Sequence, residues 1–116
     1  MYMVMAGSLD NWKTQIRKGY LELCVLALVK HEVKVYGFDL LEKLAATGLE
    51  VKEGTLYPLL NRMNVDGLLL AKWETEGVKG HPRKFYSLTK TGGQMLKEMA
   101  DEFTEMVSIY RAIEKG

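Results

Sequence analysis

The sequence has few of the residues that most often build special chemistry: one cysteine, two prolines and two histidines among 116 residues. Cys24 cannot form a disulfide within the chain, which is typical of a reducing compartment, and its apolar neighbours favour a small buried side chain. The longest uninterrupted apolar run covers residues 23–29, far below the ~20 residues of a membrane-spanning helix. The apolar start, residues 1–5, is too short for a signal peptide and has no basic residue before it. These absences predict a cytoplasmic protein that does not enter a membrane.

The charges also lack a bias, since 16 basic and 15 acidic residues leave a formal net charge of +1. A nucleic-acid partner would therefore have to bind a local cluster of cations. His31, His81 and Cys24 do not have the spacing of a metal site, and neither a phosphate-binding loop nor a nucleophile elbow is present. The sequence thus predicts no catalytic residue, no metal site, no cofactor and no enzyme activity. Its length and its 47% of hydrophobic residues predict one folded core.

Three helices are predicted in the first half of the chain. The first begins after an N-cap at Asp10 or Asn11 and continues to about Lys30, with Gly19 as a point of interruption. The second covers about residues 36–46 and the third about residues 52–65. Phe38, Leu41 and Leu44 form the predicted apolar stripe of the second helix. The linker between the second and third helices is short and places Gly48 at a left-handed C-cap, an arrangement that indicates a helix-turn-helix.

A β-hairpin and a final helix are predicted in the second half. Residues 68–75 and 84–89 are the strands, and the glycine-containing segment 77–83 connects them. Thr89 or Thr91 caps the last helix, which ends near Glu114. The predicted fold class is mainly α with a small β-hairpin (α+β), a winged helix-turn-helix with a C-terminal dimerisation helix. The predicted division is 1–92 for the DNA-binding domain and 93–116 for the dimerisation helix.

The start of the third helix is the first candidate site, because a recognition helix presents its early residues to the major groove. Arg62 could bind guanine or phosphate, and Asn61 could bind adenine. The alternative is a polar helix face that meets only water. The candidates taken from the residues themselves are Lys52, Thr55, Tyr57, Asn61 and Arg62.

The hairpin tip is the second candidate site, since it contains cations and no acidic residue between Gly77 and Tyr86. Glycine lets a backbone come close to DNA, and lysine and arginine neutralise phosphates. The alternative is an ordinary solvated loop. The wing candidates are Lys79, Gly80, His81, Arg83 and Lys84.

Apolar residues recur in the last helix at alternating spacings of three and four. This heptad-like face extends for about two and a half heptads, which favours packing against another helix, such as the first helix of a partner. The alternative is that the face folds back on its own domain. The predicted dimerisation residues are Leu96, Met99, Phe103, Met106, Tyr110 and Ile113.

Trp12 and Trp73 are candidates for an effector pocket, since they could offer flat faces to an aromatic or cationic ligand near the dimer axis. The alternative is packing in the core or on a strand face.

Four pieces of the sequence, in this order, resemble the PadR family of transcriptional regulators: residues 36–40, 54–63, 66–69 and 80–89, closed by Gly92. The resemblance covers roughly residues 18–100. It implies a winged helix-turn-helix dimer that usually represses transcription and often releases DNA when it binds a small, commonly phenolic, compound. By position it also places Pro58 in the recognition helix, residues 79–84 in the wing, and the dimer contacts in the C-terminal helix.

Two features depart from the family pattern. His81 stands where a second basic residue is common, which implies a weaker or pH-dependent wing. The single C-terminal helix is that of the short subgroup, so an effector pocket would have to form within the dimer.

Together these features predict a sequence-specific regulator, acting as a homodimer on a pseudo-palindromic double-stranded DNA operator and released by a small aromatic effector. Two-fold symmetry predicts half-sites ~34 Å apart. The alternative from another class is a ligand- or partner-binding helical dimer that does not use DNA.

Overall fold

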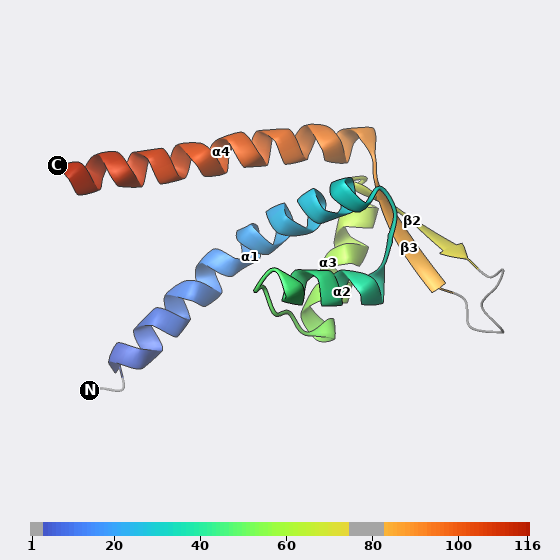
Figure 1. The fold of residues 1–116 in the computed structure, drawn as a ribbon, viewed down its shortest axis with the longest axis horizontal. Coiled ribbons are helices and arrows are strands. Elements are labelled where there is room, and N and C mark those ends of the chain that lie inside the picture. Colours follow the sequence, from blue (N-terminus) through green and yellow to red (C-terminus); the bar gives the residue numbers. More distant parts are fainter. Residues whose placement is uncertain (1–3, 75–82) are drawn as a thin grey trace.

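The computed structural model describes residues 4–74 and 83–116, which form four helices and a three-stranded sheet (Figure 1). The elements are, in chain order, α1 (Val4–Glu32), β1 (Val35–Tyr36), α2 (Gly37–Ala46), α3 (Glu53–Val65), β2 (Leu69–Glu74), β3 (Arg83–Leu88) and α4 (Lys90–Lys115). This arrangement confirms the predicted fold class. In the described ranges, none of the helices has the length and apolar character that crossing a membrane requires. The predicted wing residues Lys79, Gly80 and His81 lie outside the described residues.

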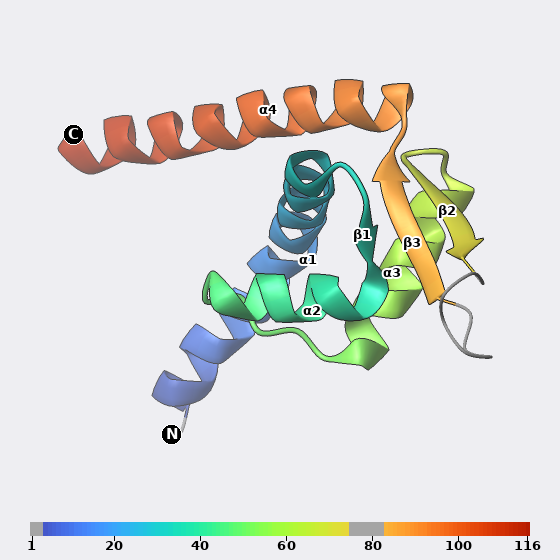
Figure 2. The ribbon, with the colours of Figure 1, turned by 45° about the vertical axis from the view of Figure 1, so that its right-hand side comes forward.

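The core lies where α2 and α3 meet the C-terminal half of α1 and the sheet (Figure 2). The side chains of α3 that enter it recur at spacings of four and three, which is why this segment is an amphipathic helix despite Pro58. The linker from α2 to α3 starts at Gly48, whose φ of +102° confirms the left-handed C-cap. The largest fully buried side chains are Leu26, Leu40, Leu44, Leu56, Leu60, Met63 and Leu69.

The sheet contains a strand that the sequence did not predict. β1 pairs antiparallel with β3, Val35 opposite Tyr86 and Tyr36 opposite Phe85, so β3 is the central strand in the order β1-β3-β2. The predicted start of the second helix at Tyr36 was therefore one residue early. Two residues are too few to show the alternation by which a strand is recognised, and only their pairing with β3 defines them.

The two long helices also differ from the predictions at their ends. α1 begins at Val4, several residues before the predicted caps, and Gly19 does not interrupt it. Thr89, and not Thr91, is the N-cap of α4, because its hydroxyl oxygen accepts a hydrogen bond from the Gly92 amide at 2.9 Å.

The N-terminal half of α1 and the C-terminal half of α4 extend away from the core as two diverging arms (Figures 1 and 2). The radius of gyration is 17.0 Å, whereas a compact chain of this length has roughly 13 Å. Where the arms are still close, the rings of Tyr20 and Phe103 lie 5.9 Å apart. Beyond this contact, large apolar side chains on both arms face solvent.

Candidate nucleic-acid interface

An open groove of about 400 Å³ lies between α3, the start of α2 and the β2–β3 hairpin. It brings together predicted residues of the recognition helix and of the wing that are more than 20 positions apart in the sequence. The groove is lined by Tyr36, Gly37, Phe38, Tyr57, Asn61, Trp73, Arg83, Lys84 and Tyr86.

Strand register explains why Lys84 reaches this groove. Lys84 pairs with Trp73, two positions along from the Tyr86–Ala71 pair, so both pairs lie on the same face of the sheet. Tyr86 is buried against the helices, which identifies this as the face next to α3. The ammonium of Lys84 lies 5.4 Å from the centre of the Trp73 ring, within the range of a cation–π contact. In the described part of the chain, no carboxylate lies within 4.0 Å of Lys84.

Gly37 and Tyr57 determine how closely α2 and α3 approach in the groove. A Cβ at position 37 would lie 3.2 Å from the Tyr57 ring, so glycine lets this ring pack against the start of α2. Burial, and secondarily the charge of Glu53, raises the pKa of the Tyr57 hydroxyl, which stays neutral and able to donate a hydrogen bond. Asn61 is exposed one turn further along α3. Both side chains are therefore available to groups that enter the groove.

Phe38 was predicted to belong to the buried stripe of α2, and this was wrong. It is 56% exposed at the first turn of the helix, where it lines the groove, while Leu40 and Leu44 form the buried stripe. Hydrophobic periodicity did not predict this position because it does not show where a helix leaves the core.

Arg83 lines the groove, but its guanidinium already contacts groups of its own chain. Its guanidinium stacks on the Tyr36 ring, with its carbon 3.8 Å from the ring centre, and lies 3.6 Å from the Asp39 carboxylate. Because Asp39 belongs to the first turn of α2, these contacts attach the wing to the helix-turn-helix.

A second group of contacts joins β2 to β1. The Tyr36 hydroxyl donates to Glu74, and the Lys34 ammonium lies 3.4 Å from the same carboxylate. Hydrogen bonding by Tyr36, and then by Lys34, lowers the pKa of Glu74. Since the pKa of the folded state is depressed, this contact stabilises the protein above the ordinary pKa of glutamate. The contribution is lost as the pH falls through the lowered value.

Tyr36→Phe should raise the pKa of Glu74, because the donor with the largest effect on it is removed. A titration of the glutamate side-chain carboxyl carbons by NMR measures this shift. Tyr110→Phe is a matched control, since it removes a hydroxyl that donates to Glu114 at 3.2 Å on α4. Equal Glu74 titrations in the wild type and Tyr36→Phe would contradict this assignment.

Arg62 does not line the groove, although it was predicted to contact DNA. Its guanidinium lies 2.8 Å from the Glu22 carboxylate on α1 and 3.6 Å from Asp66. Lys52 and Thr55 line a different depression, next to α1. The predicted recognition residues therefore lie on two sides of α3, and exposed Pro58 belongs to neither set of lining residues.

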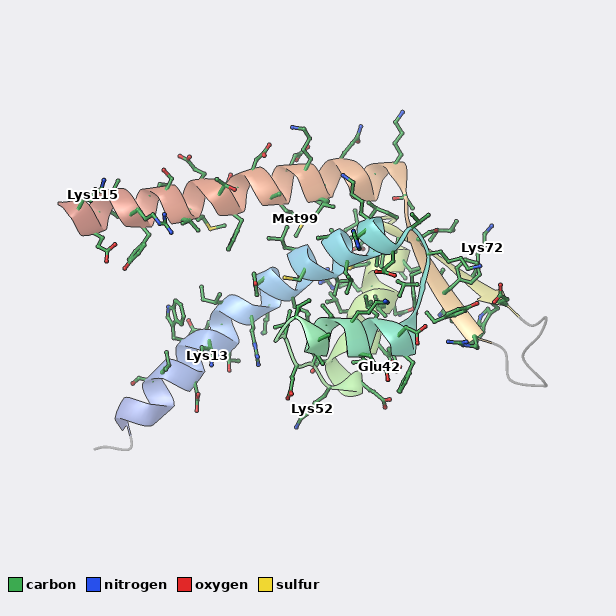
Figure 3. All side chains as sticks on the ribbon, in the orientation of Figure 1. Lys13, Glu42, Lys52, Lys72, Met99 and Lys115 are labelled. Atoms are coloured by element: carbon green, nitrogen blue, oxygen red, sulfur yellow. The ribbon has the colours of Figure 1, made fainter. Side chains whose placement is uncertain are left out.

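The predicted dimerisation residues divide in a similar way. Leu96 is buried in the core of its own chain, and Met99 packs against that core, with its side chain directed toward α1 (Figure 3). The other four are exposed: Phe103, Met106, Tyr110 and Ile113. The α1 arm carries a matching exposed stripe of Leu9, Trp12, Ile16 and Tyr20.

Trp12 and Trp73 do not share a site within the chain. Trp12 is 58% exposed on the α1 arm, whereas Trp73 is in β2 at the opposite end of the molecule (Figures 1 and 2).

Comparison with known proteins assigns the chain to a family. The transcriptional regulator PadR-like family matches residues 25–98, more than half of the sequence. The chain belongs to this family. PadR-like proteins are DNA-binding transcriptional regulators, and the matched region extends from the buried half of α1 through the wing into α4.

Individual PadR-like proteins are similar over most or part of the chain. A PadR family regulator of known structure from Eggerthella lenta has a TM-score of 0.85 at 28% identity and covers 98% of this chain and 99% of its own. A PadR-like transcription factor from Bacteroides fragilis has a TM-score of 0.76 at 42% identity and covers 90% of this chain and 99% of its own. Transcriptional regulator Rv3488 of Mycobacterium tuberculosis is 40% identical over 65 residues, which span 56% of this chain and 59% of that protein.

Proposed function

We propose that this protein is a cytoplasmic, homodimeric repressor that binds a pseudo-palindromic operator in double-stranded DNA. The observation that supports this most directly is the groove in which Tyr57 and Asn61 of α3 face Lys84 of the wing. Amide and hydroxyl groups suit base edges, and the Lys84 ammonium, which has no carboxylate within 4.0 Å among the described residues, suits a phosphate. In this proposal Asn61 and Tyr57 contact bases, and Lys84 contacts the backbone. Thr55 and Pro58 lie at the helix surface, and the wing tip contributes Lys79, Gly80 and His81.

Arg62 and Arg83 have a positioning role in this proposal. Each is held by carboxylates of its own chain, Arg62 by Glu22 and Asp66, and Arg83 by Asp39. A guanidinium in such a pair has to exchange its carboxylate before it can bind DNA. Arg62 therefore fixes α3 against α1, and Arg83 fixes the wing against α2.

Two diverging arms with exposed apolar stripes support the homodimer. A second copy would cover Trp12 and Ile16 on α1 and Met106 and Tyr110 on α4, all exposed in the single chain. Apolar patches of this kind mark association surfaces. The dimer would present its two recognition helices to half-sites ~34 Å apart.

Release by a small aromatic effector is the last part of the proposal. Because the two tryptophans lie at opposite ends, they would act differently. A ligand that stacks on Trp73 would compete with DNA in the groove, and one that stacks on Trp12 would act at the dimer face. Ligand titrations followed by tryptophan emission in Trp12→Phe and Trp73→Phe distinguish these positions.

The first test is selection of bound sequences from a random duplex library at two salt concentrations. An enriched two-fold symmetric site with steep salt dependence is the expected result. Absence of binding at both concentrations would instead favour the helical dimer that binds a ligand or partner without DNA.

Lys84→Gln should weaken binding to all sequences alike and flatten the plot of log affinity against log salt by about one unit per protomer. Lys97→Gln, which removes the same charge from the outer surface of α4, is the control and should leave the slope unchanged. Equal slopes for the wild type and Lys84→Gln would contradict the phosphate contact.

A further inference from the structure

We infer a second phosphate-binding surface for DNA, formed by Arg17 and Lys18 of α1 together with Lys52 at the start of α3. It lies on the side of the recognition helix away from the wing groove. The inference rests on the proposed DNA-binding function and extends it to α1, which otherwise contributes to the core and to the dimer face.

The surface is a depression of about 300 Å³ where α1 meets the linker and the beginning of α3. Arg17 and Lys18 border it on one side, and Lys52 and Thr55 border it on the other. Its apolar floor includes Leu21 and Leu49. A concave site with cations on both walls fits an anion that passes between them.

The charges in this depression are unbalanced. Among the described residues that line it, Glu50 is the one acidic residue against three cations. Across the described ranges 4–74 and 83–116, none of these three cations lies within 4.0 Å of a carboxylate, whereas Arg62 and Lys43 are both ion-paired. Cations that the fold leaves without acidic partners are available to neutralise phosphates.

The start of α3 adds donors to the same place. The N-cap residue is Lys52, whose side chain cannot accept a hydrogen bond, and the intrahelical bonds begin with the Thr55 and Leu56 amides. For the Glu53 and Gly54 amides, no backbone or side-chain acceptor occurs in the described residues. Free amides at a helix N-terminus bind anions. The Glu53 side chain projects about 200° around the helix from Thr55, so it lies away from this surface.

The helical period of α1 separates this surface from the dimer face. Thr14, Arg17, Lys18 and Leu21 recur at i, i+3, i+4 and i+7 and form one face of the helix. The exposed apolar residues Trp12, Ile16 and Tyr20 form another. α1 can therefore contact a second copy and DNA at the same time.

The position in the molecule fits a DNA contact. Lys52 lies at the edge opposite α4, and the α1 arm extends toward that same edge (Figure 3). With Lys84 on the other side, the recognition helix is flanked by cations on both sides, as a helix in the major groove would require for the two bordering backbones.

The test is the double variant Arg17→Gln/Lys18→Gln, assayed on a mixed-sequence duplex and on the selected operator. We expect the salt slope to fall by about 2 units per protomer and affinity near 0.1 M salt to fall at least about tenfold, with an unchanged sequence preference. Lys90→Gln/Lys97→Gln on α4 removes the same charge and should leave the slope close to that of the wild type. Arg17→Lys/Lys18→Arg keeps both charges and should retain binding.

The outcomes separate this inference from the proposed function. A wild-type slope for Arg17→Gln/Lys18→Gln, with a reduced slope for Lys84→Gln, overturns the second surface and leaves the regulator intact. Equal losses in the α1 and α4 double variants also overturn it, since general charge would then suffice. If the wild type binds neither duplex, both proposals fail. Thermal unfolding and sedimentation of each variant establish that fold and oligomeric state are retained.

Discussion

The double variant Met106→Glu/Tyr110→Glu is expected to be a monomer and to bind the operator much more weakly than the wild type. Both side chains are exposed on the α4 arm, at 54% and 60%, where the proposed second copy would bury them. Burial of one large apolar side chain contributes about 1.5–3 kcal/mol. A symmetric dimer would bury four such side chains, Met106 and Tyr110 from each protomer. Losing them, and adding four charges to the interface, should raise the dimer dissociation constant at least about a thousandfold.

Operator affinity should fall when dimerisation is lost. In a dimer, binding of one half-site raises the effective concentration of the second protomer at the other half-site. Loss of this linkage commonly weakens binding by about 10²–10⁴-fold. Sedimentation velocity measures the oligomeric state, and titration of the selected operator measures the affinity.

The matched control places the same two glutamates on the opposite side of the same helix. Ser108→Glu/Ala112→Glu keeps the spacing of four residues, and both positions are exposed. This variant should stay dimeric. A dimer that persists in Met106→Glu/Tyr110→Glu, or that dissociates equally in both variants, would show that this face of α4 does not hold the two copies together.

Gly92→Ala is expected to destabilise the fold by about 3 kcal/mol or more. A Cβ at this position would lie 2.0 Å from the backbone oxygen of Leu68 and 2.9 Å from its carbonyl carbon. The backbone at Leu68, directly before β2, would have to move, and overpacking against it is costly. The Leu68 oxygen also accepts hydrogen bonds from the amide and the hydroxyl of Thr89, so this movement would disturb the start of α4.

Gly93→Ala is the control for this prediction. Its added Cβ would have its nearest neighbour at 3.8 Å, a normal contact with Leu88. Alanine favours a helix interior by up to about 1 kcal/mol over glycine, so this variant should be as stable as the wild type or slightly more stable. Urea unfolding at one fixed protein concentration compares them, since association contributes to apparent stability. Equal midpoints for the two variants would contradict the close approach of α4 to the Leu68 backbone.

Much of the fold could be predicted because it is encoded in residues close together in the chain. The stripe of Leu56, Leu60 and Met63 marks α3 through its period, and Gly48 marks the end of α2 because only glycine enters a positive φ at little cost. The same periodicity indicated an apolar face on α4 that includes Met106 and Tyr110.

The candidate site was predicted less completely. Asn61 was expected in the third helix and Lys84 in the second hairpin strand, and the structure places them in α3 and β3, where both line one groove. The Arg62–Glu22 and Arg83–Asp39 ion pairs were not predicted, because they join α3 to α1 and β3 to α2. Asp66 follows Arg62 by four positions, a spacing that could have indicated an ion pair, whereas Glu22 lies 40 positions away and only the fold brings it to Arg62.

The sequence by itself determined the identity of most elements, the polar face of α3, the cations of the wing and the apolar face of α4. Only the tertiary structure decided that Val35 and Tyr36 form a strand, that Phe38 leaves the core, and that Arg17, Lys18 and Lys52 line one depression. The physical reason is the separation along the chain between the residues that interact. Helical periods, caps and turns depend on residues within about one or two turns of each other, whereas strand pairing, ion pairs and grooves depend on which surfaces the packed core brings into contact.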